Sequence, residues 1–306
     1  MKQGPAALVA AALLALGGCK GRSRPEPPKP VERQASAVEA DAAPKPRPSK
    51  PGSDVTFLVV SDTHFGYGGM VEQNRALVSE VNGIEGRAYP PSVGGTVGRP
   101  RGLLVTGDLT EWGRTDEWEP FVATYGLDGG ADGLLHMPVF EVIGNHDKVH
   151  GPWVEAMVVA RHGGRFYSWD WDDLHLVALG EAPDDEGLAF LTKDLATIAP
   201  NVPVVLYFHL ALEGPWSTGN WFAEGTYKQR LLTAIAGHDI LAIFHGHHHA
   251  TDHYVWHGID VFKPGAAKND AHTFAVARLT DQRFTVDSYD WNAHVWREMF
   301  AKERRR

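Results

Sequence analysis

Cysteine is almost absent from this sequence, with one residue in a chain of 306. A single cysteine excludes an internal disulfide, and it also excludes zinc sites built from four cysteines or from two cysteines and two histidines. An exported form of this chain therefore depends on its hydrophobic core alone. Because the sequence holds 16 histidines, any metal chemistry must use imidazole and carboxylate groups.

Basic residues are also in deficit, with 29 Lys and Arg against 38 Asp and Glu, for a formal net charge of −9. This balance argues against a domain that binds nucleic acid through a wide basic face. We expect no nucleic-acid partner beyond a small nucleotide as a substrate. Hydrophobic residues make up 43% of the chain, which is enough for a buried core and excludes a disordered protein.

The apolar run at residues 6–16 is too short to span a bilayer of ~30 Å hydrocarbon thickness. Lys2 precedes the run and small residues follow it, a pattern that predicts a secretory signal over residues 1–19. Cys19, the only cysteine, ends this segment, which resembles the lipobox of bacterial lipoproteins. The resemblance implies an exported chain on the periplasmic or cell-surface side of a bacterial membrane, anchored by lipid at Cys19. An ordinary signal peptide with a chance cysteine is the alternative.

Residues 20–53 are rich in proline and charge and have few large apolar side chains, which predicts an extended tether. The first 53 residues carry nine basic and four acidic side chains, so the acidic excess belongs to the remainder. We expect one domain over residues 54–290. Residues 291–306 end in Lys-Glu-Arg-Arg-Arg and are expected to form a basic, solvated tail.

Short apolar runs alternate with amphipathic segments in the remainder of the chain, which indicates an α/β fold. The expected helices cover residues 70–81, 117–125, 187–198 and 227–236. A hairpin is expected around residues 172–173, and the strand-like segments between 253 and 288 suggest a second sheet. The expected buried strands are 55–60, 103–106, 139–143, 204–208 and 240–244.

Polar side chains suited to metal binding come directly after each of these five strands. Because ligands bind at the carboxyl ends of strands in open α/β sheets, five loops should bring these side chains to one edge. The side chains are Asp62 and His64, Asp108, Asn145 and His146, His209, and His247 and His249.

Such a set suits a hydrolytic site with two metal ions. Imidazole and carboxylate ligands favour Zn, Fe and Mn, a carboxylate such as Asp108 can bridge two ions, and Asn145 offers an uncharged oxygen. Two ions ~3.5–4 Å apart can hold a bridging hydroxide and clamp a phosphate for in-line attack.

The motifs, taken in chain order, resemble the calcineurin-like metallophosphoesterase family. They are Asp62-x-His64, Gly107-Asp108-x-x-Glu111, Gly144-Asn145-His146-Asp147, a lone His209 after a strand, and Gly246-His247-x-His249. The resemblance extends over residues 55–262 and implies a four-layer α-β-β-α sandwich, with two sheets inside and helices outside.

The resemblance also assigns roles to residues. It implies that Asp108 is shared by two divalent or transition-metal ions, that His146 is the acid that assists the leaving group, and that Glu111 orients His146. The ligands of one metal would be Asp62, His64, Asp108 and His249, and those of the other Asp108, Asn145, His209 and His247.

One departure narrows the expected activity. Where the Ser/Thr protein phosphatases of the family have an Arg that binds phosphate, this chain has Trp112, so a bidentate phosphate donor is missing. We therefore expect a hydrolase of phosphate esters that favours phosphodiesters. The alternatives are a phosphomonoesterase such as a nucleotidase, and a non-catalytic surface lipoprotein that keeps the fold. The oligomeric state stays open.

Several further residues receive weaker interpretations. His245 is either a residue that supports the ligands or one packed at a strand end, and Asp147 either orients a ligand or caps a helix. His248 should point away from the metals, and we expect no ligand role for His253, His257 and His272. Trp216 and Trp221 either contact an apolar part of the substrate or pack their loop onto the core. Residues 87–101 form either a lid that supplies Arg to a phosphate or only a long loop.

Overall fold

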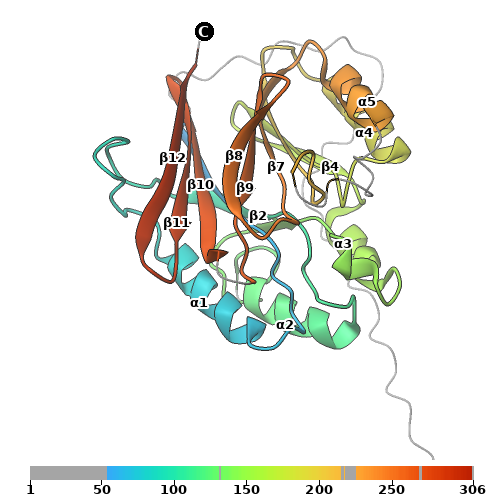
Figure 1. The fold of residues 1–306 in the computed structure, drawn as a ribbon, viewed down its shortest axis with the longest axis vertical. Coiled ribbons are helices and arrows are strands. Elements are labelled where there is room, and N and C mark those ends of the chain that lie inside the picture. The colour runs from blue at the N-terminus through green and yellow to red at the C-terminus, as the bar shows by residue number, and fades with distance from the viewer. Residues whose placement is uncertain (1–53, 131, 215–216, 218–224, 269–270, 305–306) are drawn as a thin grey trace, which may run out of the picture.

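A computed structural model describes residues 54–304 except 131, 215–216, 218–224 and 269–270 (Figure 1). The predicted signal and tether, with Trp216 and Trp221, lie outside these described residues. Two six-stranded sheets form the centre of the described part, in the orders β12-β11-β10-β1-β2-β3 and β4-β5-β6-β7-β9-β8. In the first sheet the strands are β1 Asp54–Val60, β2 Pro100–Val105, β3 Val139–Glu141, β10 Thr273–Thr280, β11 Arg283–Asp290 and β12 Val295–Glu303. In the second they are β4 Tyr167–Trp171, β5 Leu174–Ala178, β6 Pro203–Tyr207, β7 Asp239–Phe244, β8 Thr251–Trp256 and β9 Ile259–Pro264.

Parallel strands form one half of the first sheet, with β3 at its edge, and the middle of the second sheet. Strand β1 pairs in parallel with β2, and β2 with β3; in the second sheet β5, β6, β7 and β9 form a parallel series. These strands are apolar runs because helices or the other sheet cover both of their faces. Antiparallel strands β10, β11 and β12 extend the first sheet beyond β1.

The two sheets pack face to face, and helices cover their outer faces. Along β1, Val55, Phe57 and Val59 point into the core between the sheets, whereas Leu58 and Val60 point to the outer core. This alternation follows from the two-residue period of a strand. The predicted four-layer α-β-β-α sandwich is thus confirmed.

The helices lie on opposite sides of the paired sheets (Figure 1). Helices α1 Met70–Asn82, α2 Thr115–Tyr125 and α3 Trp153–His162 contribute to the outer core of the first sheet. Helices α4 Asp185–Leu195 and α5 Gly225–Ile235 contribute to that of the second. Four of the five were expected from the sequence within a few residues, whereas α3 was not.

The segment expected as a basic tail contains strand β12. Residues Val295–Glu303 pair in antiparallel register with β11, and Trp296 packs on Tyr89 with ring centroids 5.0 Å apart. The charged residues of this strand face solvent on an edge strand, which is a common place for them. The sequence predicted a tail because these charged residues interrupt the apolar pattern by which a strand is recognised.

Residues 87–101 run up to and include the first two residues of β2, at the opposite end of that strand from Asp108. Arg87 pairs with Glu80 of α1 at 3.2 Å, and Arg101 pairs with Asp172 of the β4–β5 turn at 2.9 Å. Neither side chain is directed to the predicted metal site, so the structure favours the long loop over the lid.

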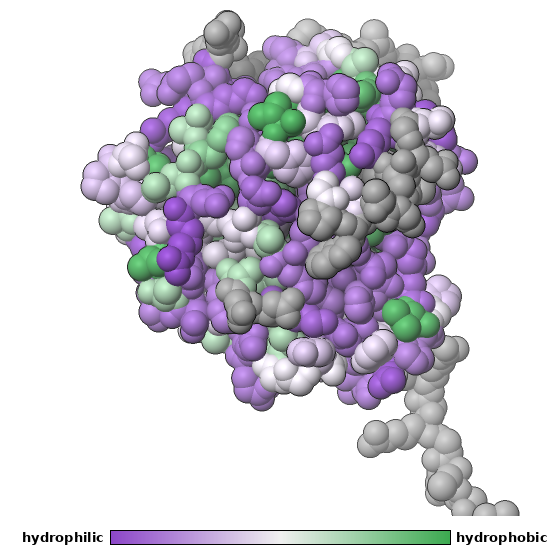
Figure 2. All heavy atoms as spheres, viewed as in Figure 1, coloured by the Kyte–Doolittle hydropathy of each residue, from purple (hydrophilic) through white to green (hydrophobic). Residues whose placement is uncertain are grey.

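The surface in Figure 2 is mainly hydrophilic, with hydrophobic residues in small, separate patches. None of the helices that the structure describes has the length and apolar character needed to cross a membrane.

Candidate metal centre

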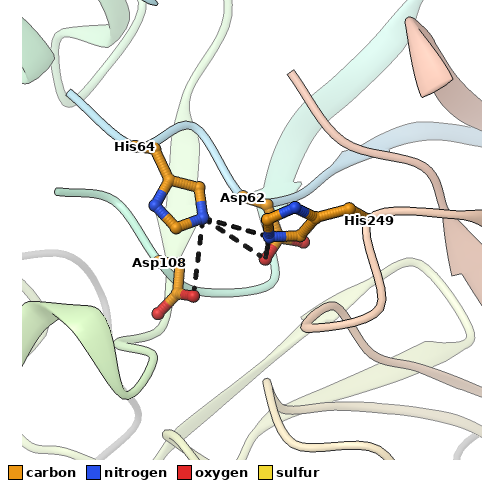
Figure 3. A group of neighbouring side chains, drawn as sticks. All are labelled: Asp62, His64, Asp108 and His249. Atoms are coloured by element: carbon orange, nitrogen blue, oxygen red, sulfur yellow. Dashed lines mark hydrogen bonds and ion pairs between the residues drawn. The ribbon is translucent and has the colours of Figure 1, made fainter. Parts of the chain in front are cut away.

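The predicted ligands meet at the carboxyl ends of strands from both sheets. Asp62 and His64 follow β1, Asp108 follows β2, and the loop after β7 supplies the last two histidines. The parallel direction of these strands places all of these loops at the same edge. Four of the side chains point toward a common centre in Figure 3.

The first group consists of Asp62, His64, Asp108 and His249, whose ligand atoms all lie within 4.8 Å of one another. The Nε2 atoms of His64 and His249 are 3.2 Å apart, and His249 Nε2 is also 3.2 Å from Asp62 Oδ1. Asp108 Oδ2 lies 3.6 Å from His64 Nε2. Figure 3 shows these contacts as dashed lines.

The second group shares Asp108 with the first and adds His209 and His247. Asp108 Oδ2 is 3.2 Å from His209 Nε2, and Asn145 Oδ1 is 3.1 Å from the same nitrogen. The structure therefore brings together all seven side chains that the sequence predicted as ligands, with Asp108 common to both groups.

Close contacts at Nδ1 fix the orientation of two of these imidazoles. The Nδ1 of His64 forms an ion-pair contact with the Glu111 carboxylate, 2.8 Å from Oε2, and the Nδ1 of His209 donates a hydrogen bond to the Thr106 carbonyl at 2.8 Å. Because both partners only accept, each neutral ring carries its lone pair on Nε2. This arrangement is typical of metal-binding histidines.

A cation fits this donor set. The Nε2 lone pairs of His64 and His209 face carboxylate and amide oxygens that are themselves acceptors. Converging lone pairs repel one another unless a proton or a cation lies between them. Two divalent ions would remove this repulsion in both groups, and nitrogen with carboxylate oxygen is the donor set of Zn, Fe and Mn.

Burial and neighbouring charge shift the pKa values of the ligands. Burial lowers the pKa of His64, and it lowers that of His247 to about 4, so both are neutral and able to bind metal at pH 7. Burial works against the charge of His209, yet the Asp108 carboxylate raises its pKa to about 10. Without metal, a proton on His209 therefore compensates the buried carboxylate, and a metal ion would replace that proton.

The backbone at the site is held in an uncommon conformation. Asp62, His64, Asp108, His247 and His249 have φ angles between 42° and 72°. Residues other than glycine rarely adopt this left-handed region, because it costs of the order of 1–3 kcal/mol for each residue. Such conformations are found mainly at functional sites.

Close packing of the loops requires glycine in two of the motifs. A Cβ atom on Gly144 would lie 2.1 Å from Asp108 Oδ1, and one on Gly107 would lie 2.6 Å from His209 Nδ1. The Gly-Asp and Gly-Asn-His-Asp motifs thus need glycine because the side chain of a predicted metal ligand occupies the place of the Cβ.

Glu111 contacts His146 differently from the prediction. Its main-chain carbonyl accepts from His146 Nδ1 at 2.8 Å, whereas its carboxylate lies 4.0 Å from that nitrogen. The carboxylate instead binds His64 Nδ1 and Lys268 Nζ, the latter at 2.7 Å from Oε2. Glu111 therefore orients His146 through its backbone and His64 through its side chain.

Asp147 ties two of the motif loops together. Its carboxylate accepts from the backbone nitrogens of Leu109, Thr110 and Gly144 at 2.8–3.1 Å. Burial and the Asp108 charge raise the pKa of Asp147 to about 7. The side chain thus positions the loops that carry Asp108 and Asn145, rather than capping a helix.

The other histidines lie outside the two groups. His245 is buried and binds the Gly246 carbonyl and the Tyr254 hydroxyl, each at 2.9 Å, so it packs at the end of β7. His253 pairs with Asp260 at 3.1 Å. His248, His257 and His272 belong to no ligand group among the described residues.

Sequence reasoning missed Lys268, which neutralises Glu111 from the loop after β9. No motif signals it, because its position follows from the way β10 returns beside β1. A cavity beside the site, lined in part by Asn145 and His247, was also missed from the sequence.

Comparison with known proteins gives the same class. Residues 55–251 match the calcineurin-like phosphoesterase family. GAP50, the anchor in the inner membrane complex of Plasmodium, is 10% identical with a TM-score of 0.59, over 83% of this chain and 90% of that one. Purple acid phosphatase PPD1 from yellow lupin (Lupinus luteus) seeds is 11% identical with a TM-score of 0.57, over 85% of this chain and 55% of that one. The curated proteins include no match.

The fold and the paired His/Asp groups define a metallophosphoesterase domain, a class that binds divalent metals and acts on phosphate esters. This chain belongs to the calcineurin-like phosphoesterase family. At identities of 10–11%, the two solved structures indicate a shared fold and nothing more specific.

Proposed function

We propose that this chain is an exported, lipid-anchored phosphoesterase that hydrolyses a phosphate ester with the help of two metal ions, with a phosphodiester as the favoured substrate. The observation that carries the proposal is the position of Asp108, whose carboxylate faces ligand atoms of both groups, His64 at 3.6 Å and His209 at 3.2 Å. A shared carboxylate is the arrangement that two-metal hydrolytic sites use.

The chain's residues would divide the work as follows. Asp62, His64, Asp108 and His249 would hold one ion, and Asp108, Asn145, His209 and His247 the other. Bound divalent cations supply Lewis-acid activation and neutralise charge that develops on phosphate oxygens. Glu111 and the Thr106 carbonyl keep His64 and His209 in the orientation that binding needs.

His146 is suited to move a proton at the edge of the site. Its Nδ1 is held by the Glu111 carbonyl, and its backbone nitrogen donates to Asp108 Oδ1 at 2.9 Å. The ring is partly exposed and lies 4.8 Å from the His64 ring, measured between centroids. Nε2 is then the atom that can hold the proton given to the leaving oxygen.

The test uses the full chain purified in detergent, with bound metal measured directly. We expect hydrolysis of bis(4-nitrophenyl) phosphate to exceed that of 4-nitrophenyl phosphate. His146→Asn should lower kcat ~10²–10⁴-fold while the bound metal stays unchanged, and Asp108→Asn should lose both metal and activity. A wild-type protein that binds two ions and cleaves neither ester would make the non-catalytic binding module the correct function.

The lipid anchor is tested separately. A palmitate analogue with an alkyne group should label the full chain in a bacterial host, and Cys19→Ala should remove the label and release the chain from the membrane fraction. Unlabelled wild-type protein in the soluble exported fraction would support the ordinary signal peptide instead.

A further inference from the structure

A cavity of about 490 Å³ opens beside the metal centre. Asn145 and His247 form the end of the cavity that meets the centre, and α3, the segment before β4 and the loop after β5 form most of the rest. Its volume lies within the ~300–1,000 Å³ of typical small-molecule sites. The two ligand residues are of the same group, so a phosphate held there could extend its organic part directly into the cavity.

One wall of this cavity is apolar and rigid. Val158 and Val159 of α3 line it together with Ile143, Phe166 and Leu210. Phe166 packs against two glycines, since a Cβ on Gly187 would lie 2.9 Å from its ring and one on Gly180 3.3 Å. A preformed apolar wall favours an organic group with apolar surface.

Helix α3 is held in place by a buried ion-pair cluster. Glu141 at the end of β3 forms ion pairs with Arg161 Nε at 2.6 Å and with His162 Nε2 at 2.9 Å, and Arg161 also donates to the Gly126 carbonyl at 2.7 Å. Because these groups are buried, a shift of α3 would leave an unpaired charge inside the protein. The apolar wall is therefore present before a ligand arrives.

Each cation in the described cavity lining is already paired with a carboxylate, which disfavours a second phosphate there. Among the described lining residues, Lys148 pairs with Glu181, and Arg165 lies 2.9 Å from Asp184 and 3.5 Å from Glu155. Three carboxylates thus face two cations. A ligand with further phosphate groups would bring negative charge toward an acidic lining.

From the wall and the charges together, we infer that this cavity binds the organic part of the substrate and selects a group with apolar surface and no further negative charge. The inference rests on the proposed function and names its substrate class, a phosphate ester with one phosphate group. The same charges disfavour nucleoside diphosphates and triphosphates.

Binding of stable analogues tests the cavity without turnover. Calorimetry on the full, metal-loaded chain should show that 1-naphthylmethylphosphonate binds at least about tenfold more tightly than inorganic phosphate. Val159→Trp should fill the cavity and remove this preference while the affinity for inorganic phosphate and the bound metal stay unchanged. Val255→Trp, on an exposed position of β8, is the matched control and should behave as the wild type.

The charge selection has its own pair of variants. Wild-type protein should bind thymidine diphosphate no more tightly than thymidine monophosphate, and Glu181→Gln, which frees Lys148, should strengthen binding of the diphosphate at least about threefold. Glu186→Gln is the control, because Arg165 keeps Asp184 as a partner.

The outcomes separate the two proposals. If Val159→Trp and Phe166→Ala both bind the naphthyl compound as the wild type does, the cavity is not the subsite, whatever the activity. Tighter binding of the diphosphate to wild-type protein would overturn the charge selection. If the wild-type protein binds the analogue but hydrolyses neither ester, the proposed function is wrong and the subsite is still supported.

Discussion

At the scale of single residues, the fold holds the site in backbone conformations that its residues do not prefer. Five of the seven candidate ligands adopt left-handed backbone angles, each at a cost of ~1–3 kcal/mol. The surrounding loops hold them there through hydrogen bonds, such as those from His64 N to the Asp108 carbonyl and from Asp62 N to the Gly107 carbonyl. These hydrogen bonds hold the strained backbone, and with it the imidazoles and carboxylates, in place before any ligand binds.

Gly144 should be indispensable to the shared carboxylate. Gly144→Ala places a methyl group 2.1 Å from Asp108 Oδ1, so Asp108 must move, and a displacement of ~1 Å can lower kcat ~10²-fold. Metal content and kcat/KM toward a diester check this expectation. The control is Gly68→Ala, where no atom lies within 4 Å of the added methyl. Unchanged activity in Gly144→Ala would show that Asp108 tolerates the displacement.

Glu111 should control metal affinity through His64. Glu111→Gln keeps the shape of the side chain but removes the charge that His64 Nδ1 and Lys268 contact. Loss of such a supporting partner lowers metal affinity ~10–100-fold. Competition with a chelator measures the change, and Glu119→Gln on the exposed side of α2 serves as the control. Equal metal affinities of Glu111→Gln and the wild type would show that Glu111 does not support metal binding.

At the scale of elements, the strands supply the positions and the helices fix the strands. Helix α4 is joined to the second sheet by a buried histidine as well as by apolar packing. His175 of β5 lies between Asp170 of β4 and Asp194 of α4, with both ring nitrogens 2.8 Å from a carboxylate oxygen. This ion triad connects three elements that are adjacent in the fold.

The triad should make stability depend on pH. Burial opposes the charge, but the hydrogen bonds to Asp170 and Asp194 raise the pKa of His175 to about 9. Since this pKa lies above the value of ~6.5 in an unfolded chain, the stabilisation is complete below pH ~6.5 and is lost as the pH rises through about 9.

Urea unfolding at pH 6 and at pH 9.5 measures this effect. His175→Gln should lower the free energy of unfolding by ~2–3 kcal/mol at pH 6 and by clearly less at pH 9.5. His257→Gln, at an exposed position, should show no such pH dependence. A loss of equal size at both pH values would mean that His175 stabilises the fold by packing alone.

At the scale of the whole molecule, the site exists because two sheets meet with their parallel strands pointing to one edge. Ligands from the first sheet, such as Asp62 and Asp108, face ligands from the second, such as His209 and His249. Metal ions at this edge would connect the two halves of the sandwich and should stabilise the folded chain as a unit.

Metal removal should therefore lower the Tm of the full chain. A ligand at ~1,000 times its Kd stabilises the folded state by ~4 kcal/mol, and two ions would also relieve the repulsion between converging lone pairs. Thermal unfolding after EDTA treatment and dialysis, followed by addition of Mn²⁺ or Zn²⁺, measures the loss and its recovery. Asp108→Asn should respond weakly to both steps. A Tm that is independent of metal in the wild type would argue against occupied sites.

The sequence by itself determined the fold class and the seven side chains that converge, because strand periodicity and the motifs that follow each strand are local features. It also placed most helices, since their apolar residues repeat at helical spacing. The predicted lipid anchor and tether rest on the sequence alone, because residues 1–53 lie outside the described residues.

Only the tertiary structure decided the contacts between segments that are distant in the chain. The partnership of Lys268 and Glu111, the strand β12 within the expected tail, and the cavity beside Asn145 all depend on how β10 to β12 and α3 pack. The physical reason is that such contacts are set by the relative placement of whole elements, which no local pattern of residues encodes.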